Sequence, residues 1–152
     1  MRFPTILALA LALLAGAPAR VDGRPGVPPL PEYAQECASC HLAFPPGALP
    51  AASWRHLLQN LPRHFGTDAS VDAATLKQLA SWLEANAGTW KRVAEAPPQD
   101  RITRAAWFQR KHDEIGSATW TLPAVKSPSN CAACHPQAEQ GDFNEHRVRI
   151  PR

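Results

Sequence analysis

The chain has 152 residues, and its 16 Lys and Arg against 13 Asp and Glu give a formal net charge of +3 at pH 7. It has no long Lys/Arg run and no basic helix interleaved with aromatic residues, so we expect no nucleic-acid partner. The 16 prolines enforce many loops. A chain interrupted by so many loops builds only a small hydrophobic core, and small exported chains of this kind usually rely on disulfides, a metal or a cofactor for stability.

The N-terminal segment has the pattern of a secretory signal peptide. Arg2 is followed by an apolar run from Ile6 to Ala15 and then by small residues up to Ala19. A membrane-spanning helix needs about 20 apolar residues, so this run is too short to be one. We therefore expect residues 1–19 to be removed on export to the periplasm and the mature protein to be soluble.

The first half of the mature chain, residues 20–96, is predicted to be helical between loops. A short helical turn is expected over 32–42, ahead of a proline-rich loop. The next helix, over 51–61, has Ser53 as a candidate N-cap and Pro62 as its stop. The apolar face of the segment 72–87 predicts a third helix, which Gly88 ends.

The second half, residues 97–152, begins at the Pro97-Pro98 linker. A helix is expected over 103–115, ended by Gly116, and a last one over 129–140 after a loop that contains prolines. The tail from 141 to 152 is expected to be irregular. No apolar alternation is long enough to predict a sheet, so the fold is expected to be mostly α.

The four cysteines form two pairs at the same spacing, and a histidine directly follows each pair: Cys37-x-x-Cys40-His41 and Cys131-x-x-Cys134-His135. Two thiols three positions apart can both reach the vinyl groups of one haem and form thioether bonds. The next residue then presents its imidazole to the iron. The motifs predict two covalently attached haem c groups, with the two motif histidines as proximal iron ligands. We therefore expect a small cytochrome c-like helical fold, with long loops wrapped around both haems and one haem in each half.

Three haem-free interpretations compete with this one. Two disulfides would suit an exported chain but leave both histidines unexplained. Paired zinc knuckles usually lie about 15–20 residues apart, whereas 90 residues separate these two pairs. A thioredoxin-like centre needs a βαβ setting, and the sequence shows no strand pattern to supply one.

The sixth iron ligand cannot be methionine, because the only methionine, Met1, lies in the expected signal peptide. His64 lies in the turn behind Pro62, where it can point inward without obeying helix periodicity. His112 follows Trp107-Phe108 by one helical turn, on a face suited to stacking against a porphyrin. We expect these two as distal ligands, although an ordinary surface role stays open for each.

Two further histidines are reserves for the distal positions. His56 would replace His64, and His146 would replace His112. An imidazole in place of a thioether sulfur favours ferric iron, so both reduction potentials are expected to be low.

Several segments together resemble the bacterial dihaem cytochrome c family over nearly the whole mature chain. Besides the two cysteine motifs, they are Ser53-Trp54, His64 to Ala69, Trp107-Phe108 with His112, Gly141 to Phe143, and Val148 to Arg152. The resemblance implies a small periplasmic electron carrier with two bis-histidine haems. Family members are often encoded beside a membrane b-type cytochrome.

We therefore expect electron transfer from a membrane b-type cytochrome and the quinol pool to a periplasmic acceptor, through at most transient contact with membrane proteins. The chain itself is not expected to be an enzyme. The alternative is a haem enzyme or gas-binding sensor with one open axial position, for which the four histidines outside the motifs leave room.

Overall fold

The computed structural model describes residues 27–152, so the expected signal peptide at 1–19 lies outside the described residues. Within 27–152 the fold is mostly α, as predicted, and its only β-type pairing is an isolated bridge between His64 and Thr67. The α-helices of this part are α1 Pro31–Cys37, α2 Ala51–Gln59, α3 Ala73–Ala85, α4 Ala106–Lys111 and α5 Ser117–Thr121. Short 3-10 helices lie between and after them: Pro46–Ala48, Leu61–Arg63, Pro98–Asp100, Ile102–Arg104, Cys131–Ala133, Ala138–Gln140 and Glu145–Arg147.

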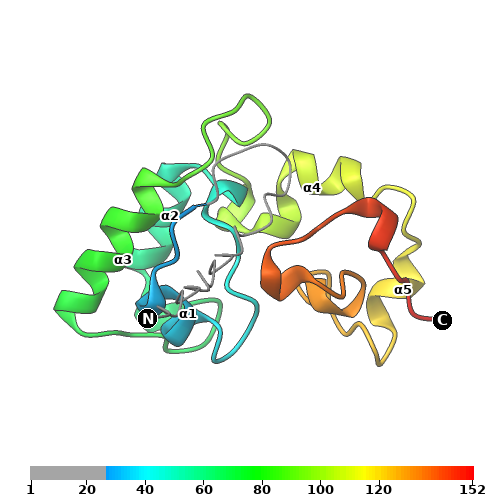
Figure 1. Ribbon diagram of the computed structural model, residues 1–152, viewed down its shortest axis with the longest axis horizontal. Helices are drawn as coiled ribbons and strands as arrows, with labels where there is room; N and C mark the ends of the chain where they lie inside the picture. Colours follow the sequence, from blue (N-terminus) through cyan, green and yellow to red (C-terminus); the bar gives the residue numbers. More distant parts are fainter. Residues whose placement is uncertain (1–26) are drawn as a thin grey trace, which may run out of the picture.

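The helices divide into two portions that lie side by side (Figure 1). Helices α1, α2 and α3 form the N-terminal portion, and α4, α5 and the C-terminal tail form most of the other. Helix α2 packs against α3, and α1 packs against α3 as well. The apolar side chains between these helices form the main core, and all are at most 6% exposed: Tyr33, Leu49, Trp54, Leu79 and Leu83.

Helix α3 begins one residue later than predicted and ends two residues earlier. The Asp72 side chain caps it by accepting hydrogen bonds from the backbone N–H groups of Ala74 and Thr75. The predicted stop at Gly88 is wrong, because the helix already ends at Ala85. Gly88 is instead buried, and a Cβ there would lie 2.5 Å from the Gly47 carbonyl oxygen. Its glycine is therefore needed for a close approach of two chain segments.

Helix α2 begins at Ala51, as expected, but Ser53 is not its N-cap. Pro50 is the N-cap, and Ser53 lies buried inside the first turn, where its N–H donates to the Pro50 carbonyl oxygen at 3.0 Å. Pro62 stops the helix as predicted, because a proline has no N–H to continue the hydrogen-bond ladder.

The second half has shorter helices than its sequence pattern predicts. The expected helix over 103–115 is broken at Ala105, which is extended (φ −63°, ψ 137°), and α4 ends at Lys111. Helix α5 falls where a loop was expected. The predicted helix over 129–140 is wrong, since only two 3-10 turns form there. Pro136 lies between these turns and disfavours helical geometry in the residue before it.

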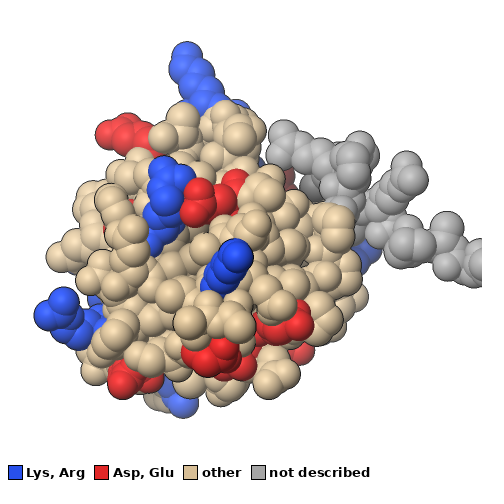
Figure 2. Space-filling model, turned by 90° about the vertical axis from the view of Figure 1, so that its left-hand side faces the viewer, with Lys and Arg blue, Asp and Glu red and all other residues tan. Residues whose placement is uncertain are grey.

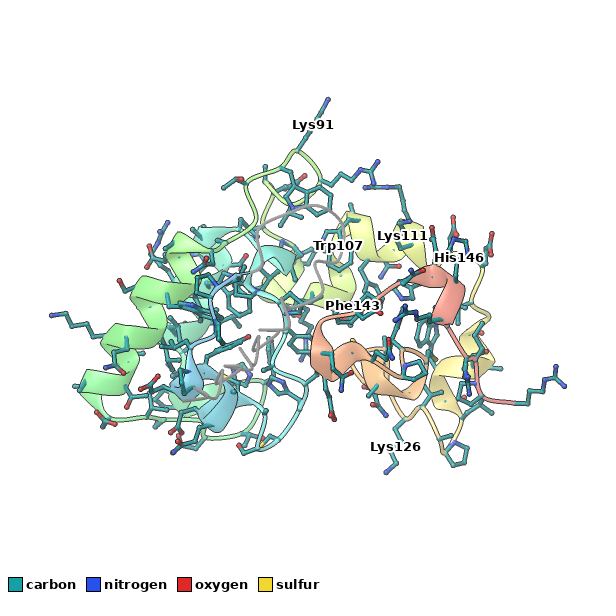
Figure 3. All side chains as sticks on the ribbon, in the orientation of Figure 1. Lys91, Trp107, Lys111, Lys126, Phe143 and His146 are labelled. Atoms are coloured by element: carbon teal, nitrogen blue, oxygen red, sulfur yellow. The ribbon has the colours of Figure 1, made fainter. Side chains whose placement is uncertain are left out.

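The two portions are joined through helix α4. Trp107 lies between them (Figure 3), and its indole N–H donates to the carbonyl oxygen of Ala48 at 3.2 Å. The C-terminal portion buries few large side chains, chiefly Phe108 and Val125. A portion with so small a core depends on something besides side-chain packing for its stability.

The outer face of the N-terminal portion carries Lys and Arg interspersed with Asp and Glu (Figure 2). Among residues 27–152, no helix is both long and apolar enough to cross a membrane.

Candidate metal centres formed by two pairs of histidines

The first cysteine motif lies at the end of helix α1. Cys37 is the last helical residue, and burial, with a smaller contribution from Glu36, raises the pKa of its thiol to about 11. Cys40 and His41 follow outside the helix, where both are exposed. The Nδ1–H of His41 donates to the Leu42 carbonyl oxygen at 2.7 Å. The lone pair of this imidazole is therefore on Nε2 and is free to bind a metal.

His64 faces His41 from the turn behind the 3-10 helix Leu61–Arg63. The centres of the two rings are 6.1 Å apart, and their planes differ by 25°. The pKa of His64 is lowered, first by burial and then by the neighbouring His41 and Arg101. The structure thus brings together the two residues that the sequence predicts as ligands of one haem, and we name them the first histidine pair.

The second cysteine motif lies on a 3-10 turn, Cys131–Ala133. Burial raises the pKa of both Cys131 and Cys134. The N–H of His135 donates to the Cys131 carbonyl oxygen at 2.8 Å, and the C-terminal tail holds the same loop through an Arg149 N–H bond to the Cys134 carbonyl oxygen at 2.9 Å. These bonds fix the backbone from which His135 projects.

His112 faces His135 from the C-terminal end of α4. Their ring centres are 6.2 Å apart with planes at 71°, and we name them the second histidine pair. The Nδ1–H of His112 donates to the Phe108 carbonyl oxygen at 2.9 Å, which leaves its Nε2 free for a metal. The pKa of His135 is lowered by burial and by His112, while the nearby Asp142 acts in the opposite direction.

The two reserve histidines do not face a motif histidine. The imidazole of His56 is 63% exposed and lies 3.5 Å from an Asp100 carboxylate oxygen. His146 is exposed on the C-terminal tail (Figure 3), next to Glu145, whose carboxylate pairs with Lys111 at 3.2 Å.

Further aromatic residues contact the two pairs. Phe44 stacks on His41 with ring centres 5.1 Å apart, and Phe143 lies 5.4 Å from His135. Trp120 lies 5.9 Å from His112. Phe44 comes three residues after the first motif, which is a signal in the sequence. Trp120 lies on α5, and the turn after α4 brings it near His112.

The residues present fit two haem c groups. An iron bonded to one nitrogen of each imidazole at about 2 Å separates the ring centres by roughly 6.3 Å, and both pairs have this separation. The Nδ1 atoms of His64 and His135 are buried without a hydrogen-bond partner, so these imidazoles are not packed as ordinary core polar groups.

The competing interpretations gain no support from the described residues. All four cysteines are free of disulfides. Within 27–152 no cluster of three or more His, Cys, Asp or Glu side chains could hold a zinc ion.

A mostly helical chain with two cysteine motifs and two facing histidine pairs defines a small two-haem c-type cytochrome. Residues 33–143 match the dihaem cytochrome c family, and the chain belongs to that family. It therefore carries two haem c groups. None of the curated proteins matches the chain.

Two solved structures are similar to this chain over most of their length. The new diheme cytochrome type c of Shewanella baltica OS155 is 40% identical with a TM-score of 0.70, and the match covers 79% of this chain and 91% of that one. A diheme cytochrome c from Rhodobacter sphaeroides is 43% identical with a TM-score of 0.66, and the match covers 74% of this chain and 95% of that one.

Proposed function

We propose that this protein is a periplasmic electron carrier whose two haems each have two histidine ligands. The observation that carries the proposal is the placement of His64 opposite His41 and of His112 opposite His135, at nearly equal separations of 6.1 and 6.2 Å. Each haem has a candidate ligand on both faces, so neither axial position is left for a substrate. This arrangement favours electron transfer over the open-site enzyme or sensor.

The roles of the chain follow from this assignment. Cys37 and Cys40 hold the first haem by thioether bonds, and Cys131 and Cys134 hold the second. The proximal ligands are His41 and His135, and the distal ligands are His64 and His112. When bound, each haem supplies one reversible ferric–ferrous couple.

The surrounding side chains keep the ligands in place. The Leu42 carbonyl oxygen fixes the ring orientation of His41, and the Phe108 carbonyl oxygen fixes that of His112. Imidazole nitrogen in place of methionine sulfur lowers the reduction potential, so the protein belongs at the low-potential end of c-type electron carriers.

The electron donor is a membrane b-type cytochrome supplied by the quinol pool, and the acceptor is another periplasmic protein. Two features support this path: the export pattern of residues 1–19 and the family's occurrence beside b-type cytochromes. Docking at the membrane is transient, since the chain needs contact only long enough for one electron to pass.

A redox titration followed by absorption tests the carrier function. Both haems should take up one electron each, reversibly and at low potential, and the ferric protein should show no high-spin band. A high-spin band would contradict the proposal and favour an open-site haem enzyme or sensor.

The donor is tested separately with membrane vesicles that contain the b-type cytochrome and quinol. These vesicles should reduce the purified protein, and an inhibitor of quinol oxidation should block the reduction. Reduction that proceeds equally well in vesicles without the b-type cytochrome would contradict this donor.

A further inference from the structure

The two proposed distal histidines are held to very different degrees. His112 is anchored twice by Phe108, through the hydrogen bond to its carbonyl oxygen at 2.9 Å and through stacked rings whose centres are 4.0 Å apart at 19°. The Nδ1 of His64 is buried and has no hydrogen-bond partner. Its ring contacts Phe65, with ring centres 4.8 Å apart and planes at 59°, and Phe65 is itself 46% exposed.

The turn that presents His64 is also strained. Phe65, the next residue, has a φ of +50°, which is costly for a bulky aromatic side chain, and Gly66 follows with a φ of +99°. The Phe65 side chain is 46% exposed, with the Arg101 guanidinium 4.1 Å from its ring centre. A hydrogen bond from the Thr67 N–H to the His64 carbonyl oxygen at 3.0 Å closes the turn. The ring that contacts His64 is therefore held less firmly than Phe108, which is only 5% exposed.

The space beside the turn would let His64 move. A cavity of about 180 Å³ adjoins it, lined by Leu57, Asn60 and Phe65 among others, and His64 itself forms part of the wall. A larger cavity, of about 460 Å³, also borders His112, so open space does not distinguish the two ligands. What distinguishes His112 is its hydrogen bond to the Phe108 carbonyl oxygen and its stack on the Phe108 ring, which is only 5% exposed.

We propose that the haem of the first histidine pair is a latent binding site for a small diatomic ligand such as carbon monoxide, opened when His64 withdraws. The haem of the second pair opens much more slowly. The proposal rests on the bis-histidine ligation proposed above. With the haem bound, His64 would leave the iron and the ligand would take its place, so that one bond to iron is exchanged for another with no change in oxidation state.

The motif histidines take no part in this opening. His41 is the neighbour of Cys40, whose thioether bond holds it beside the haem, and His135 is held in the same way by Cys134. Only the distal ligands can leave.

The difference in opening rate between the two haems can be estimated from the two contacts that hold His112. A hydrogen bond and an aromatic stack together slow the release of a histidine ligand from iron by roughly 10- to 100-fold. Carbon monoxide should therefore bind at the first haem about 10 to 100 times faster than at the second.

The test is rapid mixing of the ferrous two-haem protein with excess carbon monoxide, followed by absorption. We expect slow uptake at one haem, with a rate that stops rising at high carbon monoxide because the departure of His64 limits it. Replacing His64→Ala should turn this slow phase into a rapid one. Replacing His112→Ala should add a rapid phase and leave the slow phase unchanged.

A second measurement identifies the haem without any variant. Electron paramagnetic resonance of the ferric protein incubated with cyanide should show one of the two low-spin signals replaced, namely that of the pair with nearly parallel rings.

The substitution Phe108→Leu keeps the carbonyl oxygen but removes the stack, and it should speed carbon monoxide uptake at the second haem by up to about tenfold.

Three outcomes would overturn the proposal while leaving bis-histidine ligation intact: no uptake at either haem, equal rates at both, or a slow phase that persists in His64→Ala. Rapid uptake at either haem of the unaltered protein would instead contradict the bis-histidine ligation itself.

Discussion

The N-terminal and C-terminal portions of this cytochrome each carry one cysteine motif and one histidine pair, but the N-terminal portion has a much larger buried core. The N-terminal portion has the helix pair α2 and α3 and a core that includes Trp54, Leu79 and Leu83. The C-terminal portion has helices of six and five residues, and its large buried side chains are chiefly Phe108 and Val125. We therefore expect the first haem to sit against a protein core, and the second haem to form most of the core of its own portion.

The largest expected effect comes from removing one haem at a time. The double substitution Cys131→Ser and Cys134→Ser should release the second haem and unfold α4 and α5, because few buried contacts remain to hold them. Mass spectrometry of the denatured protein would count the attached haems, and hydrogen exchange would report the protection of each helix.

The matched control is the double substitution Cys37→Ser and Cys40→Ser. It should remove the first haem while α2 and α3 keep much of their protection from hydrogen exchange. Equal loss of protection in both portions, whichever haem is removed, would contradict the comparison.

A core substitution in the N-terminal portion should have the next largest effect. Leu83 is 1% exposed between the helices, so Leu83→Ala should lower the free energy of unfolding by about 2–5 kcal/mol. Leu76→Ala on the same helix, at a half-buried position, is the control and should cost clearly less. Denaturant unfolding followed by circular dichroism measures both, and equal losses would show that this helix face is not the core.

The close approach at Gly88 predicts a smaller loss. The substitution Gly88→Ala places a methyl group 2.5 Å from the Gly47 carbonyl oxygen and from a Val93 methyl carbon, and it should cost about 1–3 kcal/mol. Gly116→Ala is the control, since its Cβ would meet nothing within 4 Å. A melting temperature that falls equally in both variants would argue against the steric explanation.

The smallest expected effect is on the acid dependence of stability. Hydrogen bonds from the Thr75 hydroxyl and then from backbone N–H groups hold the pKa of Asp72 below its ordinary value of 3.8. Below that value the unfolded chain binds more protons than the folded one, so stability falls as the pH falls through the folded-state pKa. Above the ordinary value the contribution of Asp72 is complete.

The substitution Asp72→Asn keeps an oxygen that can cap α3 but removes the titration. Its unfolding free energy should therefore depend less steeply on pH below about pH 4 than that of the unaltered protein. Unfolding measured over a pH series checks this, and parallel curves would show that Asp72 does not contribute.

The residues of the two sites could be predicted from the sequence more completely than the bounds of the helices. The two cysteine motifs indicate haem by local spacing alone. The only methionine, Met1, lies in the expected signal peptide, which makes histidine the favoured distal ligand. His64 and His112 are both found opposite a motif histidine, although their binding to iron stays a proposal. The division at residues 96 and 97 also stays a prediction.

Other features depend on contacts that no local pattern contains. The apolar spacing over 103–115 resembles one helix, yet Ala105 is extended and the chain turns there so that Trp107 reaches Ala48. Gly88 reads as a helix stop, but its close approach to Gly47 is visible only in three dimensions. The ring contacts of Phe143 and Trp120 depend on tertiary folding in the same way.

The central claim is that His64 and His112 close the two haems, and electron paramagnetic resonance of the ferric protein tests it most directly. The unaltered protein should show only low-spin iron. His64→Ala and His112→Ala should each turn one haem high-spin, while His56→Ala and His146→Ala, as controls, should leave both low-spin. Two low-spin haems in either His64→Ala or His112→Ala, or a high-spin signal in the unaltered protein, would contradict the account.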